Sequence, residues 1–490
     1  ARGPPRAPAM LDALLLGGRC IDPESGLDAL RHVGIKDGLV ACLLEPSEAL
    51  PPTRSSVDCS GLVVAPGFID LHSHGAGHPP SARLQALDGC TFHGELEFGV
   101  CDVEEWYRVR EGSQIIHYAV TAGHIPNRVA VLSSRRSGAG PDAAAEADGE
   151  GAAWRAPDPK KPRGPCRAHA AHDRDPHLLS TCFCISSDTH QWPASGAEIL
   201  AIVDRMEAGL RAGACGLGLG IAYTSAADHE EVYRLFKLGA RWSAPLFIHS
   251  RGTFQDLTDF HEMFADAAAS GAPLHICHLN SSAAPLNVPL ILEMTRDLNE
   301  RGIDVTAEAY PYTAGMTRLD SGVFDAGWES RLRIGPGDIE WIATGERLTE
   351  ATFAARRAEG GLVAIHNIPE RVVERCLAEP AVIVASDAIP YTPDGKGHPR
   401  SAGCFCRVLG RYVRERRALG LAEALGKMSL LPARRLEALC PAFRRKGRLQ
   451  VGMDADIVCF DPSTVRDNAT FQEPMLPSTG VRELLVAGVP

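Results

Sequence analysis

Short apolar runs alternate with helix-like segments through the middle of this 490-residue chain. Runs of this length, rich in Val, Ile and Leu, are typical of buried strands, and the segments between them carry apolar residues at helical spacing. Strands that alternate with helices form a parallel sheet with right-handed crossovers, and eight such units close into a barrel. We predict eight strands, at 64–71, 92–98, 119–124, 215–221, 245–249, 274–278, 305–309 and 382–386. We predict helices at 197–212, 229–238, 257–269, 289–301 and 371–377.

Both ends of the chain read as short strands separated by turns, which predicts one composite β domain from residues 10–65 and 447–490. The barrel then takes residues 66–446. Two stretches interrupt its pattern. Residues 133–176 are poor in large apolar side chains and rich in Pro and charge, which predicts a disordered insertion. Residues 313–361 are too long for a simple loop, and we predict a lid or subdomain there. The expected fold class is α/β.

Composition excludes several classes of protein. The net charge of −11 argues against a general nucleic-acid binder, which would show a basic face. No apolar run reaches the ~18 residues that a membrane span needs, so we expect no membrane partner. The 15 cysteines lack the spacing of a disulfide framework, and no apolar leader is visible. These features predict a cytoplasmic protein.

Polar residues that bind metals or move protons stand at the ends of five predicted strands. Residues i and i+2 of a strand share a face, so each of the two closely spaced pairs can reach one point in space. In a barrel, the carboxyl ends of the strands meet at one mouth. The residues at these ends are His72 and His74, Glu95 and Glu97, His249, His278, and Asp387.

Imidazole and carboxylate groups in this position indicate a catalytic zinc site. Such a site takes three or four N, S or O ligands and leaves one position open for water. The metal polarises a carbonyl and activates the water, while a neighbouring carboxylate serves as general base. Asp387 suits the role of base. The pattern therefore predicts a metal-dependent hydrolase.

The chain resembles the amidohydrolase superfamily, and within it the N-acyl-D-amino-acid deacylases (D-aminoacylases), closest to the N-acyl-D-glutamate deacylase-like branch. The resemblance covers most of the chain outside the insertion and rests on five short stretches. These are residues 61–74, 216–223, 309–314, 397–400 and 452–471. It implies a TIM-like (β/α)8 barrel with a small β-sandwich and one or two Zn2+ per chain. It also implies that His72 and His74 hold one metal position, that His249 and His278 hold the tighter one, and that Asp387 is the catalytic base.

The second strand departs from the commoner D-aminoacylases, which place a Cys ligand there. Here the aligned position is near Phe98, and the polar candidates are Glu97, which lies nearer the strand end, and Glu95. Residues 215–223 contain no Lys, so the carboxylated lysine of many amidohydrolases is not expected from that strand.

The resemblance also implies how a small-molecule N-acyl amino acid is bound. Arg400 pairs with the α-carboxylate, and Tyr310, or Tyr312 in its place, donates to the same group. Tyr223 lines the pocket, and Arg251 faces a second carboxylate or stays a solvated rim residue. Near His278 those D-aminoacylases carry a Lys where this chain has Asn280. The pattern leaves the oligomeric state open.

We therefore expect zinc-dependent hydrolysis of the acyl-amide bond of N-acyl-D-amino acids, acidic ones such as N-acyl-D-glutamate included. Two alternatives remain. One is a cyclic-amide hydrolase of the hydantoinase or dihydroorotase kind, against which the absent Lys and the Gly-His-Pro-Arg motif count. The other is a metal-free, non-catalytic scaffold protein of the same fold, which would be expected to have lost ligand residues.

Overall fold

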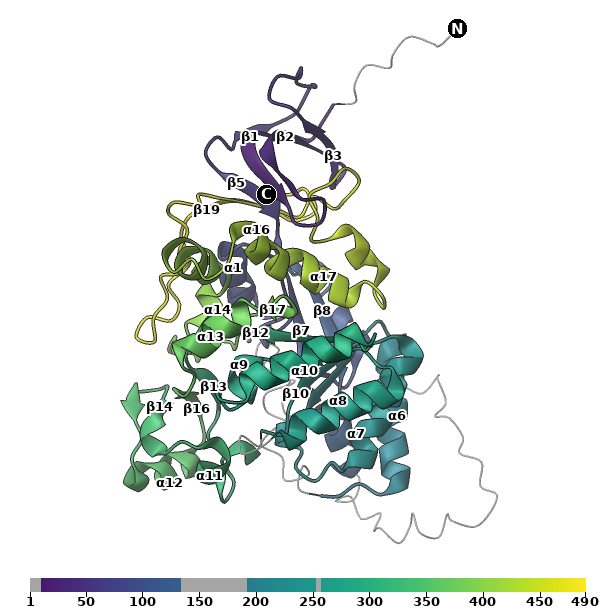
Figure 1. Ribbon diagram of the computed structural model, residues 1–490, viewed down its shortest axis with the longest axis vertical. Coiled ribbons are helices and arrows are strands. Elements are labelled where there is room, and N and C mark those ends of the chain that lie inside the picture. The colour runs from purple at the N-terminus through teal and green to yellow at the C-terminus, as the bar shows by residue number, and fades with distance from the viewer. Residues whose placement is uncertain (1–9, 134–191, 253–256) are drawn as a thin grey trace, which may run out of the picture.

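A computed structural model describes residues 10–133, 192–252 and 257–490. Figure 1 shows three parts: a β domain at one end of the molecule, a barrel below it, and a small third sheet at the side of the barrel. Most of the predicted insertion at 133–176 lies outside the described residues. Within the described ranges, no helix combines the length and the apolar character that crossing a bilayer requires.

Eight parallel strands form the barrel. Hydrogen bonding runs in the order β17-β12-β11-β10-β9-β8-β7-β6, and a parallel bridge between Ser73 and Ala388 joins the first and last strands. The predicted barrel is thereby confirmed, and its strand ends share one mouth. The strands are β6 (Phe68–Asp70), β7 (Cys90–Val100), β8 (His117–Gly123), β9 (Leu217–Gly220), β10 (Leu246–His249), β11 (Leu274–Ile276), β12 (Val305–Ala309) and β17 (Val382–Val384).

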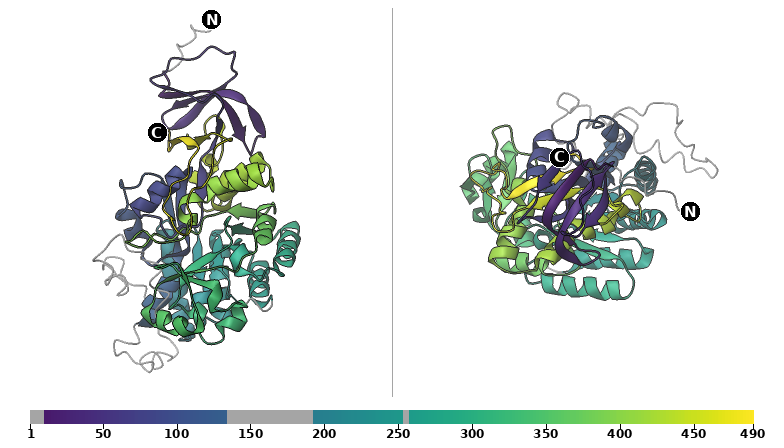
Figure 2. Two further views of the ribbon diagram at one scale, coloured as in Figure 1. Left: turned by 90° about the vertical axis from the view of Figure 1, so that its left-hand side faces the viewer. Right: turned by 90° about the horizontal axis from the view of Figure 1, so that it is seen from above.

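Helices connect these strands and cover the outside of the barrel (Figures 1 and 2). Local signals fix their ends: α6 begins with a capping box in which Ser195 and Glu198 bind each other's backbone, and α8 ends at Gly271 with φ 76°. Their apolar faces pack on the strands in one core. The long helices among them are α6 (Gly196–Arg211), α7 (His229–Trp242), α8 (Thr258–Ser270), α10 (Val288–Glu300) and α13 (Glu370–Leu377).

Further helices belong to this part of the chain. They are α1 (Pro79–Leu87), α2 (Val103–Arg108), α3 (His124–Leu132), α16 (Leu421–Leu425) and α17 (Leu431–Leu436).

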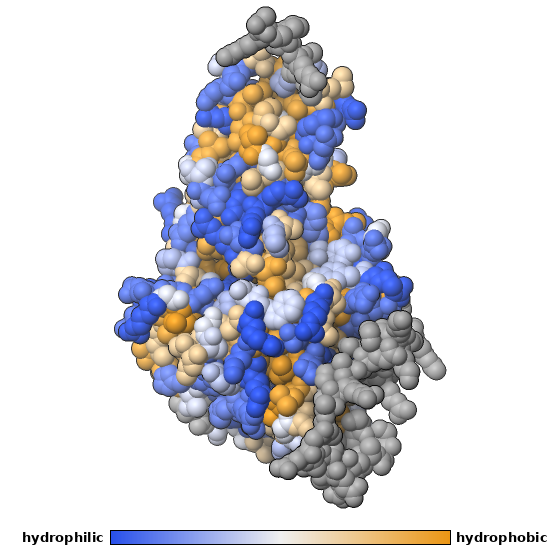
Figure 3. Space-filling model, turned by 90° about the vertical axis from the view of Figure 1, so that its right-hand side faces the viewer, coloured by the Kyte–Doolittle hydropathy of each residue, from blue (hydrophilic) through white to orange (hydrophobic). Residues whose placement is uncertain are grey.

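The β domain combines both ends of the described chain. Its sheet runs β19-β18-β5-β1-β2-β3, with β4 paired to β1, and encloses its own apolar core. Seen from above, its strands lie across the amino-terminal side of the barrel, and a hydrophilic belt crosses the waist below it (Figures 2 and 3). The strands are β1 (Ala13–Asp22), β2 (Leu27–Lys36), β3 (Leu39–Leu44), β4 (Ser56–Asp58), β5 (Val63–Pro66), β18 (Ile457–Phe460) and β19 (Val481–Leu485).

The strand predicted at 64–71 is two strands in two different sheets. Here the prediction was wrong: β5 belongs to the β domain, β6 belongs to the barrel, and Gly67 lies between them. A side chain at Gly67 would collide with Thr91, since its Cβ would lie 2.2 Å from a Thr91 methyl carbon. The chain therefore passes from one domain to the other at a point that only glycine fits.

A third sheet, in the order β13-β16-β14-β15, stands beside the barrel mouth. It surrounds a separate core that includes Phe324, Trp328 and Trp341. It falls largely within the span 313–361, whose role as a lid stays a prediction. Its parts are β13 (Gly315–Arg318), α11 (Trp328–Leu332), β14 (Ile339–Trp341), β15 (Glu346–Arg347), α12 (Glu350–Glu359) and β16 (Leu362–Ile365).

Candidate metal centre

Glu97 lies at the centre of the predicted site, between two pairs of histidines. Its Oε2 is 3.2 Å from Nε2 of His72 and 3.3 Å from Nε2 of His74. Its Oε1 is 2.8 Å from both Nδ1 of His249 and Nε2 of His278. One carboxylate thus faces four imidazoles from three strand ends, those of β6, β10 and β11, and could be shared by two metal positions.

Asp387 completes the first of these positions. Its Oδ1 lies 3.5 Å from Nε2 of His72 and 3.5 Å from Nε2 of His74. In two overlapping groups of these residues, the potential ligand atoms lie within 4.8 Å of one another. The groups are His72, His74 and Asp387, and His72, Glu97 and His278. The six side chains that the sequence placed at five strand ends, with Glu97 as the choice on β7, therefore meet at one place.

An irregularity in β7 brings Glu97 to this position. Glu95 pairs with Val120 of β8, but the next pair joins Val100 to Ala122, so five steps along β7 match two along β8. Such a bulge turns side chains that a regular strand would send to alternate faces. Glu97 reaches the centre, whereas Glu95 stands behind His74.

Two of the site residues have left-handed backbone conformations. His278, just beyond β11, has φ 32°, and Asp387, just beyond β17, has φ 50°. Non-glycine residues in this region cost of order 1–3 kcal/mol and persist where the surroundings hold them. Both side chains are turned into the mouth at the point where the chain leaves its strand.

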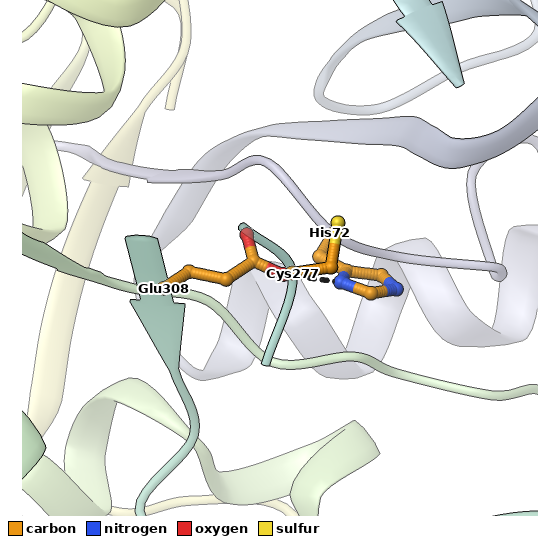
Figure 4. A group of neighbouring side chains, drawn as sticks. All are labelled: His72, Cys277 and Glu308. Atoms are coloured by element: carbon orange, nitrogen blue, oxygen red, sulfur yellow. Dashed lines mark hydrogen bonds and ion pairs between the residues drawn. The ribbon is translucent and has the colours of Figure 1, made fainter. Parts of the chain in front are cut away.

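Each of three histidines is held from behind through the nitrogen that does not face Glu97. Nδ1 of His74 contacts both oxygens of Glu95 at 3.1 Å, and Nδ1 of His278 is 2.8 Å from the Ser282 hydroxyl in the short helix α9 (Leu279–Ser282). Nδ1 of His72 contacts the carboxylate of Glu308 on β12, as Figure 4 shows. A metal-binding imidazole is commonly oriented in this way.

Sequence reasoning missed Glu308 and Ser282. The sequence did carry a signal for Glu308, because it is a carboxylate inside the apolar run of β12. A carboxylate in such a place is rarely buried without a polar partner. Ser282 carried no comparable signal.

The charges of the site call for a cation. Four carboxylates are buried here, those of Glu95, Glu97, Glu308 and Asp387, and Arg400 pairs with one of them, Asp387. Burial alone would lower the pKa of His72, but Glu308, Glu97 and Asp387 raise it well above its usual value. Burial alone would raise the pKa of Glu97, but the imidazoles around it hold it well below its usual range. The site therefore favours added positive charge.

These residues fit one or two zinc ions. Imidazole nitrogens and carboxylate oxygens are ligands that zinc accepts, and three of the imidazoles present a nitrogen whose ring partner is already bonded elsewhere. His72, His74 and Asp387 would hold one ion, His249 and His278 the other, with Glu97 shared between them.

Arg400, at the start of α14 (Arg400–Gly403), lies next to Asp387. Its Nη2 is 2.8 Å from Oδ2 of Asp387, and its guanidinium packs 4.6 Å above the ring centre of Tyr310. The guanidinium is buried, and its Nε and Nη1 have no hydrogen-bond partner in the part of the chain that the structure describes. Tyr312, the alternative to Tyr310, instead donates to the backbone oxygen of Gly403 at 3.0 Å.

A cavity of about 450 Å³ opens on the metal centre. Its wall is largely apolar and includes Phe98, Tyr223, Met316, Val323 and Ile365, the last three from the segment that carries the third sheet.

Arg251 reaches the same cavity, but Glu262 binds its guanidinium in a bidentate manner at 2.6 and 2.8 Å. Its predicted contact with a second carboxylate stays a prediction. His124 lies elsewhere, buried and bonded to Glu231 at 2.6 Å.

Comparison with known proteins agrees with this geometry. Residues 373–490 match the Amidohydrolase family. The chain is 28% identical over 504 residues to the D-aminoacylase of Alcaligenes xylosoxydans xylosoxydans, a match that covers 98% of this chain and 94% of the relative. The chain is similar to amidohydrolases along nearly its whole length. It is also 29% identical to the N-acyl-D-glutamate deacylase of the same organism, over 98% of this chain and 93% of the relative.

A solved structure has the same architecture as this chain. It is the N-acyl-D-glutamate deacylase of Bordetella bronchiseptica, complexed with zinc and a phosphonate inhibitor. The TM-score is 0.74 at 25% identity, and the match covers 98% of this chain and 96% of that one. The amidohydrolase fold expected from the sequence, a barrel with a small β domain, is confirmed.

Proposed function

We propose that this amidohydrolase uses zinc to hydrolyse the acyl-amide bond of N-acyl-D-amino acids. The observation that carries the proposal is the convergence of four histidines on the carboxylate of Glu97, with Asp387 beside them at the barrel mouth. Relatives named for this activity match nearly the whole chain, which supports the same reaction class here.

Zinc, when bound, supplies Lewis-acid polarisation of the acyl carbonyl and activation of a water molecule. Asp387 supplies the proton transfers. Its Oδ1 faces the metal-binding nitrogens, so it accepts a proton from the attacking water and then delivers that proton to the departing amide nitrogen. The products are a carboxylate and a free amino acid.

The guanidinium of Arg400 is the proposed partner of the α-carboxylate of the substrate. It is buried, offers nitrogens without hydrogen-bond partners, and is held in place by the ring of Tyr310. Arg binds a carboxylate through two parallel hydrogen bonds, which fixes the orientation of the substrate as well as its affinity.

The apolar residues of the cavity wall favour a substrate with an apolar side chain or acyl group. Tyr223 and Phe98 pack edge to face at 5.3 Å between ring centres, beside the metal centre. Glu262 pairs with Arg251, the residue expected to face a second carboxylate, and Asp320 pairs with Arg318, which lines the same cavity. We therefore propose that N-acyl-D-leucine or N-acyl-D-phenylalanine is hydrolysed faster than N-acyl-D-glutamate.

The matching experiment is a substrate panel with purified, zinc-loaded protein. It should include N-acetyl and N-formyl derivatives of apolar and acidic amino acids in both D and L forms, together with a hydantoin and dihydroorotate. We expect hydrolysis of the linear D-substrates. Turnover of the cyclic amides alone would support a cyclic-amide hydrolase, and zinc well below one ion per chain without any turnover would support a scaffold protein.

We also propose a cellular location for this protein. A reducing compartment such as the cytoplasm is supported by cysteines spread over the whole sequence without framework spacing.

A further inference from the structure

Glu308 connects two segments of the metal centre from behind. It lies on β12 with 1% of its surface exposed, and its Oε1 contacts Nδ1 of His72 (Figure 4). The same oxygen accepts a hydrogen bond of 3.3 Å from the backbone N–H of His278, the residue with the left-handed conformation. One carboxylate oxygen therefore meets a histidine of each proposed metal position.

The second oxygen of Glu308 is anchored deeper in the barrel. Oε2 lies 2.9 Å from Nε2 of His275, whose Nδ1 is 2.7 Å from the hydroxyl of Thr306. Thr306, which is half-buried, and the buried His275, Glu308 and His72 thus form a chain of polar groups in which each member has a partner. A buried network in which every member is satisfied holds its groups in one arrangement.

We propose that Glu308 is a positioning residue that fixes the ring of His72 and the backbone of His278 relative to each other. Contact through Nδ1 leaves Nε2 of His72 directed at Glu97 and Asp387, as metal binding requires. The N–H contact holds His278 in its strained conformation, with Nε2 directed at the other oxygen of Glu97. This inference rests on the proposed function.

Two other buried glutamates differ from Glu308 in ways that separate positioning from simple burial. Glu95 contacts the imidazole of His74 through both of its oxygens. Glu231 provides a matched control: it is also 1% exposed and also bonds a histidine, His124, but touches none of the proposed ligands.

The test compares zinc binding by the wild type, Glu308→Gln and Glu231→Gln, with circular dichroism to show that each variant is folded. Zinc affinity is measured by competition with a chromophoric chelator, and zinc content after dialysis. Loss of an outer partner of a metal-binding histidine lowers metal affinity ~10–100-fold, and we expect a change of that size for Glu308→Gln. Glu231→Gln should bind zinc like the wild type.

Two results would overturn the inference. One is a folded Glu308→Gln variant that binds zinc as tightly as the wild type. The other is a thiolate band in the spectrum of the cobalt-substituted protein that disappears in Cys277→Ser, because Cys277 also lies next to His72 and Glu308 and would then make this group a metal site of its own. In either case hydrolysis by the zinc-loaded wild type still tests the proposed function, which fails only if that protein has no activity.

Discussion

Asp387 occupies a position in which one oxygen faces the proposed metal ligands and the other faces a cation. Burial alone would raise its pKa, but Arg400 and the neighbouring histidines hold the pKa well below its usual range. The carboxylate is thus ionised throughout the neutral range. Its capacity to accept a proton must therefore arise during the reaction, when the charge around it changes.

Replacing Asp387 by Asn tests its role as general base. The amide is close in shape to the carboxylate but does not accept the proton, so we expect kcat to fall at least ~100-fold. Steady-state kinetics with N-acetyl-D-leucine measure kcat, and zinc analysis measures the metal content of the variant. Asp304→Asn, which removes a carboxylate paired with Arg435 at the start of β12, is the control and should leave kcat unchanged. Undiminished hydrolysis by folded Asp387→Asn would contradict the mechanism.

The Arg400→Gln variant tests whether the guanidinium of Arg400 binds the α-carboxylate of the substrate or acts only through its contact with Asp387. If Arg400 binds the α-carboxylate, its loss removes charge-assisted hydrogen bonds of about 1.5–3 kcal/mol, and kcat/KM for N-acetyl-D-leucine falls roughly 10–100-fold. N-Isopentylacetamide is the same substrate without its carboxylate, so the variant and the wild type should cleave it at similar rates. An equal loss on both substrates would show that Arg400 acts only through Asp387.

The barrel could be predicted because its signals are local and repeated. Apolar runs with a polar residue at the end, such as the one that ends in His249, identify strands and place their ends at one mouth without knowledge of any contact. The choice between Glu95 and Glu97 could not be settled in that way, since it depends on a bulge whose size is set by the pairing of β7 with β8. The break at Gly67 depends likewise on contacts with Thr91, a residue of another strand.

The third sheet contributes one wall of the cavity, and Met316 on β13 offers a way to test its part in substrate selection. A Trp there reduces the cavity volume, so kcat/KM should fall about 10-fold for N-acetyl-D-phenylalanine and much less for N-acetyl-D-alanine. Met475→Trp, at a position that is 41% exposed, makes the same exchange outside the cavity and should alter neither. Equal losses on both substrates would mean that this sheet does not discriminate by size.

The two domains are joined by ionic contacts as well as by the chain crossing at Gly67. Asp456, just before β18, accepts a hydrogen bond of 3.0 Å from Nε2 of His117 at the start of barrel strand β8. Its other oxygen meets Nζ of Lys446 at 2.7 Å, and the backbone N–H of Ala487 donates to the oxygen that faces His117. The side chain of Asp456 is 4% exposed, so solvent screens these contacts little.

Asp456 should make the stability of the whole molecule dependent on pH in acid. Burial alone would raise its pKa, but His117 and Lys446 lower it from 3.8 to about 2. A carboxylate with a lowered folded-state pKa stabilises the protein above its unfolded-state pKa, and this contribution disappears as the pH falls from about 4 to about 2. The shift corresponds to about 2 kcal/mol. Asp456→Asn should therefore lower the free energy of unfolding in urea by about that amount at pH 7, and by about half as much at pH 3. A difference between wild type and variant that is the same at both pH values would mean that the ionised form of Asp456 does not hold the two domains together.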